Sequence, residues 1–193
     1  MHMRIRSRAE TFATLLLLPI LASGCVGGID ESLNSPISNN DTYATIGYLW
    51  SGARSAILRE REPSTDAFSL ALSFALPCAR GGSGSYRGTL SGTKASGTGS
   101  GTLAVTGVLV ECQFDDITIV RIVSAPNVTV TGTIAVAGDQ WSAINIHLVA
   151  SAVTINGVAC PGGVDVTITG SSPSSQSTST GAACGRTGAV ALP

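Results

Sequence analysis

The residues best suited to chemistry in this 193-residue chain are its five cysteines. Cys25 follows an apolar run and three small residues, whereas Cys78, Cys112, Cys160 and Cys184 are spread over the rest of the sequence. A zinc site requires cysteines or histidines at short spacings, and these four are far apart. We therefore predict no metal site. An even number of cysteines in an exported chain predicts two disulfides instead.

The first 24 residues have the parts of a secretory signal peptide. Arg4, Arg6 and Arg8 precede an apolar core over residues 12–22, and small residues follow it. The core is about 11 residues long, and a membrane-spanning helix needs about 20 apolar residues. We therefore interpret residues 1–24 as a cleaved signal rather than as a transmembrane segment.

The end of this segment, Leu21-Ala22-Ser23-Gly24-Cys25, resembles the lipobox of bacterial lipoproteins. It departs from the family at Ala22, where Leu is more common. The resemblance implies cleavage before Cys25 and a diacylglycerol on its thiol, with fatty acids such as palmitate as the anchor in membrane lipid. In that family an Asp after the cysteine favours the inner membrane, so Val26 points to the outer membrane, on its periplasmic or surface face. The alternative is a secreted protein in which Cys25 is incidental.

Composition limits the class of the remaining chain. The signal carries three of the 11 basic residues and one of the 12 acidic residues, which leaves a net charge of −3 and no basic block. Nucleic acid is therefore not an expected partner. Residues 25–41 lack apolar periodicity and predict a flexible tether. Residues 42–193 have the length of one domain, and their Gly, Ser, Thr and Val predict many short strands.

Residues 42–62 have the pattern of an amphipathic helix. Apolar residues step by three and four along one face: Tyr43, Ile46, Trp50, Ala53 and Ile57. Asn40 or Asp41 is placed to cap the helix, and Gly47 and Gly52 allow close approach to a sheet. We expect the helix to pack on that sheet; the alternative is a helix that lies on the membrane or docks a partner.

From Phe68 onward the apolar period is two, which predicts strands. We expect strands over 68–76, 85–93, 102–114, 117–123, 128–137, 141–149, 152–158, 164–169 and 188–192. A turn is expected at Ala125-Pro126-Asn127, and a Ser/Thr-rich loop over 170–183. The short links leave no room for crossover helices. The prediction is a mainly β fold, an antiparallel meander of about 8–9 strands that forms an open curved sheet or a small barrel or sandwich.

Strand direction favours one disulfide pairing among the three that four cysteines allow. If the strand at Phe68 runs up, Cys78 lies at its top. The next strand runs down and the one after runs up to Cys112, at the same end. Cys160 and Cys184 flank the last strand and the tail. We therefore favour Cys78–Cys112 and Cys160–Cys184, on condition that the sheet curls or a loop folds over.

Few residues are suited to catalysis, and we predict neither a catalytic residue nor a cofactor. A Ser-His-Asp or Cys-His site needs a histidine base; His147 is available, but alternation within its strand turns it to solvent. Glu111, Asp115 and Asp116 form an acidic cluster that suits calcium or paired carboxylates, although a solvated hairpin turn explains it as well. Trp141 suits either a stacking platform or a cap on the core.

These observations favour a non-enzymatic envelope lipoprotein that binds a partner or has a structural role. An apolar-ligand carrier would have a hollow between helix and sheet lined by residues such as Leu70, Leu72 and Ile146. A carboxylate-based hydrolase would need Glu111, Asp115 or Asp116 to converge in a cleft with a second acid. A small outer-membrane barrel is disfavoured by the low aromatic content and the absence of interface girdles.

Mass spectrometry of the mature chain tests the lipobox. We expect an N-terminus at Cys25 that carries diacylglycerol, and no free thiol at the four later cysteines. An intact Met1 N-terminus in the cytosol, or free thiols at all four later cysteines, would contradict the prediction.

Overall fold

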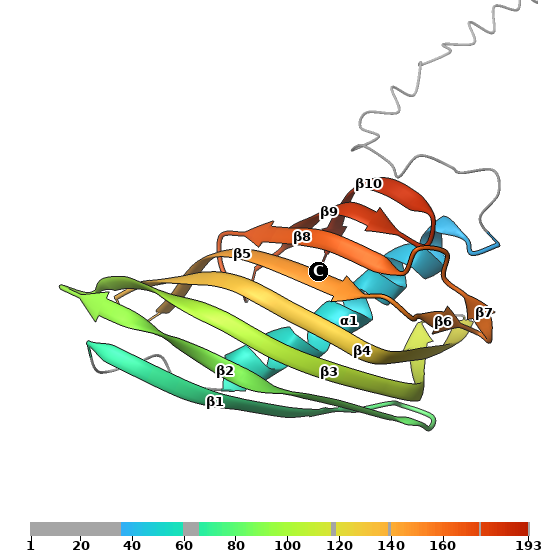
Figure 1. Cartoon of the computed structure of the whole chain (residues 1–193), viewed down its shortest axis with the longest axis horizontal. Coiled ribbons are helices and arrows are strands. Elements are labelled where there is room, and N and C mark those ends of the chain that lie inside the picture. The colour runs from blue at the N-terminus through green and yellow to red at the C-terminus, as the bar shows by residue number, and fades with distance from the viewer. Residues whose placement is uncertain (1–35, 60–65, 117–118, 139, 174, 193) are drawn as a thin grey trace, which may run out of the picture.

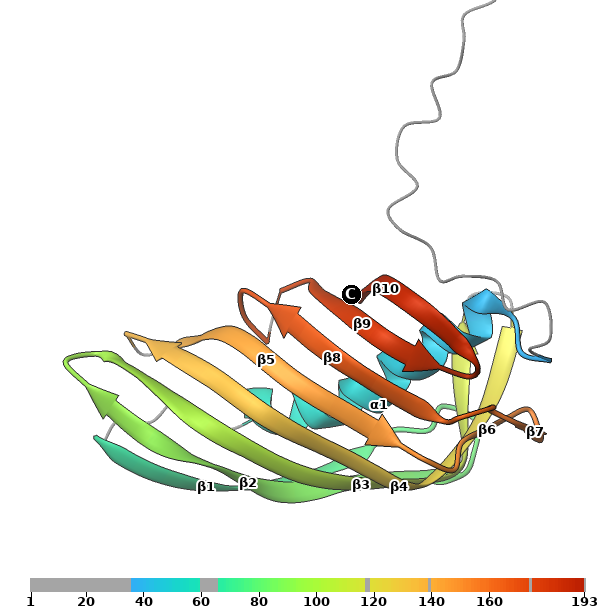
Figure 2. The ribbon, with the colours of Figure 1, turned by 45° about the horizontal axis from the view of Figure 1, so that its top comes forward.

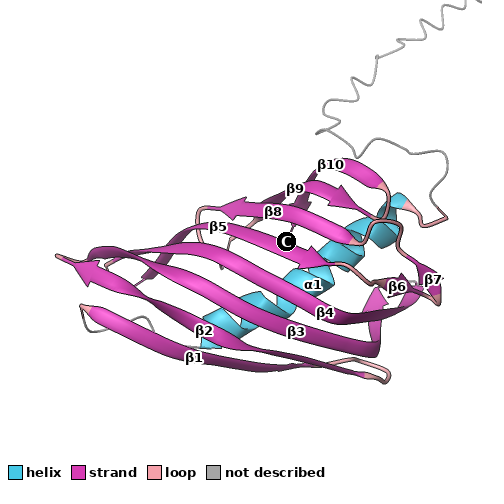
Figure 3. Ribbon diagram, in the orientation of Figure 1, coloured by secondary structure: helices cyan, strands magenta, loops and turns pink. Residues whose placement is uncertain are grey.

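The computed structural model describes residues 36–59, 66–116, 119–138, 140–173 and 175–192. These residues form one helix and a single mainly antiparallel β-sheet, so the fold is mainly β, as predicted (Figure 3). The helix is not long and apolar enough to cross a membrane.

The elements follow one another in a simple order. The helix α1 (Asn39–Arg59) comes first, and the strands are β1 (Ala67–Leu76), β2 (Ser83–Ala95), β3 (Thr98–Asp116), β4 (Ile119–Ala137), β5 (Gln140–Ala150), β6 (Thr154–Ile155), β7 (Val158–Ala159), β8 (Val164–Gly170), β9 (Ser177–Ala183) and β10 (Arg186–Leu192).

The sheet is a meander with two edges. Its order is β1-β2-β3-β4-β5-β8-β9-β10, and the short hairpin of β6 and β7 pairs with β4 outside this path. The sheet curls so that α1 lies in its hollow side, with β1 at one edge and β10 at the other (Figures 1 and 2). We call the side that faces α1 the concave face and the other side the convex face.

Alternation along each strand separates the two faces chemically. Apolar side chains such as Leu90, Leu103 and Val130 are buried on the concave face. The convex face presents small hydroxyl and amide side chains that the strand register aligns into rows, for example Ser91, Thr102, Thr133, Asn145, Thr169 and Thr178. The period of two in the sequence therefore encodes one core face and one solvated face.

The helix begins earlier than the periodicity indicated, because its cap is Ser38. The Ser38 hydroxyl oxygen accepts a hydrogen bond from the Asp41 backbone N–H at 3.1 Å and donates one to the Asp41 carboxylate at 2.6 Å. The first bond is the side-chain cap of a helix N-terminus, and the second joins the two side chains, whereas in a capping box the carboxylate accepts from the backbone N–H of the cap residue. The expectation of a cap at Asn40 or Asp41 was wrong in position, although Asp41 takes part in the motif.

Helix and sheet come closest at Tyr86, whose ring lies between two glycines. A Cβ added to Gly52 of α1 would stand 2.0 Å from a Tyr86 ring carbon, and one added to Gly107 of β3 would stand 2.5 Å from another. The fully buried Tyr86 hydroxyl donates a hydrogen bond to the Leu49 carbonyl at 2.8 Å. Burial raises the pKa of this hydroxyl. Gly52 thus has the role expected of it.

The turn predicted at Ala125-Pro126-Asn127 is instead a bulge within β4. Pro126 and Asn127 lie opposite the single residue Val108 of β3, and the register resumes on either side. A second bulge on β3, at Glu111 with φ of 46°, restores the offset. Proline is tolerated at a bulge because no ladder hydrogen bond is needed there, so one strand runs through residues expected to separate two.

The Ser/Thr-rich segment is also more regular than predicted. Residues 177–183 of the expected loop form β9, where Ser177 and Ser179 are buried on the concave face. Between β5 and β8, the strand expected over 152–158 is a small hairpin around Asn156-Gly157, both with positive φ. An Asn-Gly pair is a strong hairpin signal, and it was available in the sequence.

Both disulfides have the pairing that strand direction favoured. Cys78 and Cys112 have Cα atoms 5.0 Å apart, and Cys160 and Cys184 have Cα atoms 4.4 Å apart. The first bond joins next-but-one strands because the loop after β1 folds over the extension of β3. The Gln113 N–H donates to the Gly81 carbonyl at 3.0 Å there.

The two helix glycines provide a matched test of helix–sheet contact. We expect Gly52→Ala to lower the free energy of unfolding by about 1–3 kcal/mol or more, because the added methyl meets a rigid ring. Gly47→Ala should raise it by up to about 1 kcal/mol, because its Cβ enters open space and alanine favours helix. Denaturant unfolding measures both. Equal effects of the same sign would contradict this packing.

Candidate functional site

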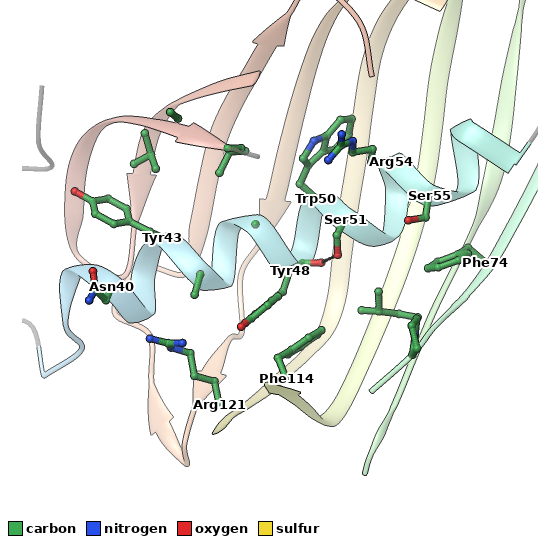
Figure 4. A pocket seen from close by; sticks show the side chains of 17 residues that line it. Asn40, Tyr43, Tyr48, Trp50, Ser51, Arg54, Ser55, Phe74, Phe114 and Arg121 are labelled. Atoms are coloured by element: carbon green, nitrogen blue, oxygen red, sulfur yellow. Dashed lines mark hydrogen bonds between the residues drawn. The ribbon is translucent and has the colours of Figure 1, made fainter. Parts of the chain in front are cut away.

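The two faces of α1 have different surroundings. One face is buried against the sheet through Ile46, Leu49, Gly52, Ala53, Ala56 and Ile57. The other lines a half-open groove of about 800 Å³, through residues that include Tyr43, Gly47, Tyr48, Ser51, Arg54 and Ser55 (Figure 4). We call this cavity the α1 groove. It lies on the side of the helix that faces away from the concave face.

The walls of the α1 groove come from both ends of the sheet. Phe74 and Leu76 of β1 line one side, and Val190 and Leu192 of β10 line the other. These are the two edge strands, which do not pair with each other. The groove therefore runs beside α1 in an open sheet and is bounded by residues of both edge strands.

Gly47 leaves room in the floor of the groove. No heavy atom lies within 4 Å of the position that a Gly47 Cβ would take. Gly47 was expected to let the helix approach the sheet, as Gly52 does; the structure places it on the opposite face instead. Both glycines are single glycines within the predicted helix, so only the packed structure shows that they have different roles.

Aromatic rings supply much of the apolar lining. The Tyr48 ring stacks on Phe114 from the end of β3, with centroids 3.7 Å apart and planes inclined by 7°. The Arg59 guanidinium lies 4.7 Å from the centroid of the Phe74 ring, close enough for a cation–π interaction. These contacts fix the rings from two separate strands against one helix.

An ion pair holds one end of the groove. Arg121 of β4 is 2% exposed, and its Nε donates to the Asp41 carboxylate at 2.6 Å. Burial opposes ionisation of Asp41, but hydrogen bonds from Ser38 and Arg121 and the charge of Arg121 outweigh it. The pKa of Asp41 is therefore below its usual value. The bridge joins the first turn of α1 to the sheet.

Further polar groups lie along the same groove. Arg54 donates from Nε to the Pro173 carbonyl in the link between β8 and β9. Trp50 lines the groove and is 1% exposed, and its buried Nε1 has no hydrogen-bond partner. A buried indole N–H normally has one. The groove thus combines aromatic and aliphatic walls with a few hydrogen-bonding groups, which is the usual chemistry of a ligand site.

The residues singled out for catalysis lie elsewhere. His147 faces solvent, as predicted, and its Nε2 lies 2.7 Å from the carboxylate of the exposed Asp165. Glu111 is exposed on its bulge, and the side chains of Asp115 and Asp116 lie outside the described part. Glu111 is not among the described residues that line the α1 groove. Among the residues that the structure describes, no cluster of three His, Cys, Asp or Glu is placed to hold a metal.

The hollow expected between helix and sheet is occupied by side chains. Leu72 and Ile146 are buried at 2% and 0% exposure within the core, and Leu70 packs against it. Trp141 is a core residue whose ring lies edge-on to Phe68, with centroids 6.3 Å apart. Space for a ligand is on the other side of the helix. Periodicity could not show this, because the spacing places Tyr43 on the buried stripe.

Cys25 lies outside the described residues, so its acylation stays a prediction. Comparison with protein-family models, with curated proteins and with solved structures found no match.

Removal of Asp41 should destabilise the fold through Arg121. We expect Asp41→Ala to cost about 2–4 kcal/mol at pH 7, between the value of a hydrogen bond to a charged group and that of a broken buried pair. Because the pKa of Asp41 is lower in the folded state, its contribution is present above about pH 4 and is lost as pH falls through the folded pKa. Urea unfolding should therefore show that the difference in stability between variant and unsubstituted chain shrinks as pH falls below about 4.

Asp165→Ala is the control for this experiment, because it removes an exposed partner of His147. We expect a change of about 0–1 kcal/mol. A larger loss for Asp165→Ala than for Asp41→Ala would contradict the importance assigned to the buried pair.

Proposed function

We propose that this chain is a non-enzymatic envelope lipoprotein that binds the acyl chain of a membrane lipid in the α1 groove. The proposal combines a groove of about 800 Å³ between the helix and both sheet edges with the lipobox that ends at Cys25. The groove is the observation that carries it.

The shape and lining of the groove support an elongated apolar ligand. Its volume lies within the range of about 300–1,000 Å³ typical of small-molecule sites. Phe74, Phe114 and Val190 provide apolar walls, and Gly47 leaves the floor open. An acyl chain has no hydrogen bonds to satisfy and fits such a lining. Hydroxyl and cationic groups at Ser51 and Arg54 suit an oxygen-rich head group.

The predicted anchor supports membrane lipid as the source of the ligand. Ten residues lie between Cys25 and Pro36, and an extended chain of that length spans at most about 40 Å. Acylated Cys25 would therefore keep the folded part close to a bilayer. Asn40 and Tyr43 line the groove within the first turns of α1, so this end of the groove is the one nearest the tether.

Val26 supports the outer membrane as the location, by the resemblance described above. The resemblance and the exposed hydroxyl rows on the convex face together favour a folded part in the periplasm or on the surface. Glu111 stands apart from the α1 groove, so no observation favours the carboxylate-based hydrolase.

Photo-crosslinking in cell envelopes tests the proposal on the full chain. Tyr43 is replaced by benzoylphenylalanine, which retains an aromatic ring in the groove. We expect irradiation to give adducts whose added mass is that of a phospholipid or fatty acid. The same substitution at Ala104, which is exposed on the convex face, should give far fewer lipid adducts.

A second variant separates groove binding from general contact with the bilayer. Gly47→Leu fills the open floor one helical turn from Tyr43 and should abolish the lipid adduct while the fold is retained. Equal lipid labelling at positions 43 and 104, or adducts with protein alone, would overturn the proposal.

A further inference from the structure

The edge strand β1 has a row of free backbone groups. In the described part of the chain β1 pairs with β2 alone. The Lys94 N–H donates to the Asp66 carbonyl at 2.7 Å, which fixes the alternation of the ladder. Even-numbered residues of β1 exchange hydrogen bonds with β2, and odd-numbered residues direct their N–H and C=O groups away from it. Ser69, Ala71 and Ser73 therefore present donors and acceptors at the edge.

This edge carries none of the features that usually block pairing. β1 is ten residues long, contains no charged residue and no proline, and pairs with β2 without a register shift. The side chains at the odd positions are alanines and serines, all exposed on the convex face. Edge strands normally carry lysine, proline or a bulge to prevent association. Their absence over a full-length strand points to a partner.

The sequence of β1 reads the same in both directions. Residues 67–75 are Ala-Phe-Ser-Leu-Ala-Leu-Ser-Phe-Ala, a palindrome centred on Ala71. Antiparallel pairing of two copies about Ala71 places residue 69 opposite residue 73 and residue 68 opposite residue 74. Each side chain then meets one of its own kind.

We propose that β1 pairs with β1 of a second copy of this chain, about a two-fold axis that passes midway between the two Ala71 residues. This register places odd residues opposite odd residues, and among them Ser69, Ala71 and Ser73 direct their backbone groups away from β2. Ser69 with Ser73, Ala71 with Ala71, and Ser73 with Ser69 each exchange two hydrogen bonds, about six in all. A slip by one residue would oppose odd and even positions and lose these bonds.

Side chains match on both faces of the seam. On the convex face Ser69 lies opposite Ser73 of the second copy, and two hydroxyls can exchange a hydrogen bond. On the concave side Leu70 lies opposite Leu72, and Phe68 opposite Phe74. Leu70 is only half-buried within one copy, so pairing covers apolar surface that the single chain leaves exposed.

The symmetry also suits a shared membrane. The two-fold axis of such a pair is perpendicular to the sheet, so the concave faces of both copies point the same way. Both helices and both grooves then lie on one side of the continuous sheet. Acylation of both copies would hold them at one bilayer and raise their effective concentration. The pairing itself does not depend on what the α1 groove binds.

Cysteine crosslinking in envelopes tests this register with the full chain. Paired residues have Cα atoms about 5.5 Å apart, within the range of a disulfide. We expect Ala71→Cys alone to form a reducible dimer under mild oxidation. Ser69→Cys alone and Ser73→Cys alone should stay monomeric, because each lies about 13 Å from its own copy. Coexpression of Ser69→Cys and Ser73→Cys should restore the crosslink. The unsubstituted chain gives the background from Cys25.

A proline variant tests the role of the free backbone. Ala71→Pro removes an N–H that points away from β2, so the fold should persist. It should abolish the crosslink between Ser69→Cys and Ser73→Cys, whereas Ala71→Val should retain it. The proposal is overturned if Ala71→Cys and the mixed pair give no dimer, if all single variants crosslink equally, or if Ala71→Pro leaves the crosslink unchanged.

Discussion

The contact between α1 and the concave face is the constraint on which the structure depends. A strongly curled sheet has an apolar hollow that must be covered, and within the described residues one helix covers it. The approach is closest at Tyr86, where the ring fits between Gly52 and Gly107 and its hydroxyl bonds to the Leu49 carbonyl. Leucine in place of the tyrosine would lack this hydrogen bond, and a side chain at either glycine would push the helix away. The depth at which α1 sits in the sheet follows from this contact.

The depth at which α1 sits in the sheet also determines where the α1 groove lies. α1 packs on the concave face, and its outer face lines a groove that residues of both edge strands, β1 and β10, also line. The Asp41–Arg121 bridge then fixes the start of the helix along the sheet. Arg186 does the same for the preceding segment, because it donates to the Ile37 carbonyl at 2.6 Å. Two buried cations thus fix the N-terminal end of the helix against β4 and β10.

Much of this architecture was predictable because it depends on local periodicity. The period of two around Phe68 predicted β1, and the steps from Ile46 to Ile57 predicted the buried face of α1. The direction of successive strands was enough to favour the two disulfides. Predictions failed where the conformation of a segment was inferred from its amino-acid composition alone. Ser177 and Ser179 were assigned to a loop because they are hydroxyl residues, yet their short side chains face the concave side of β9.

The α1 groove was not predictable, for a different reason. Gly47 and Gly52 both lie within the predicted helix and have the same helix propensity, but Gly52 meets a tyrosine ring and Gly47 meets open space. Tyr43 steps onto the apolar stripe by spacing, although the curvature of the sheet leaves it beside β10 at the edge of the core. Such differences arise from how the helix packs against a curled sheet, and the spacing of residues along the helix does not contain that information.

The openness of the sheet therefore has two consequences that belong together. Closure would have consumed the free backbone of β1, and it would also have removed the space above Gly47. α1 packs on the concave face, and β1 and β10 do not pair with each other. The strand left unpaired then needs either a protective feature or a partner. β1 carries small side chains at the positions where edge strands usually carry charges. Its sequence is symmetric about Ala71, so the antiparallel register is the same for both copies. The groove and the unpaired edge both require that the sheet stays open, so a change that brought β1 into pairing with β10 would remove both.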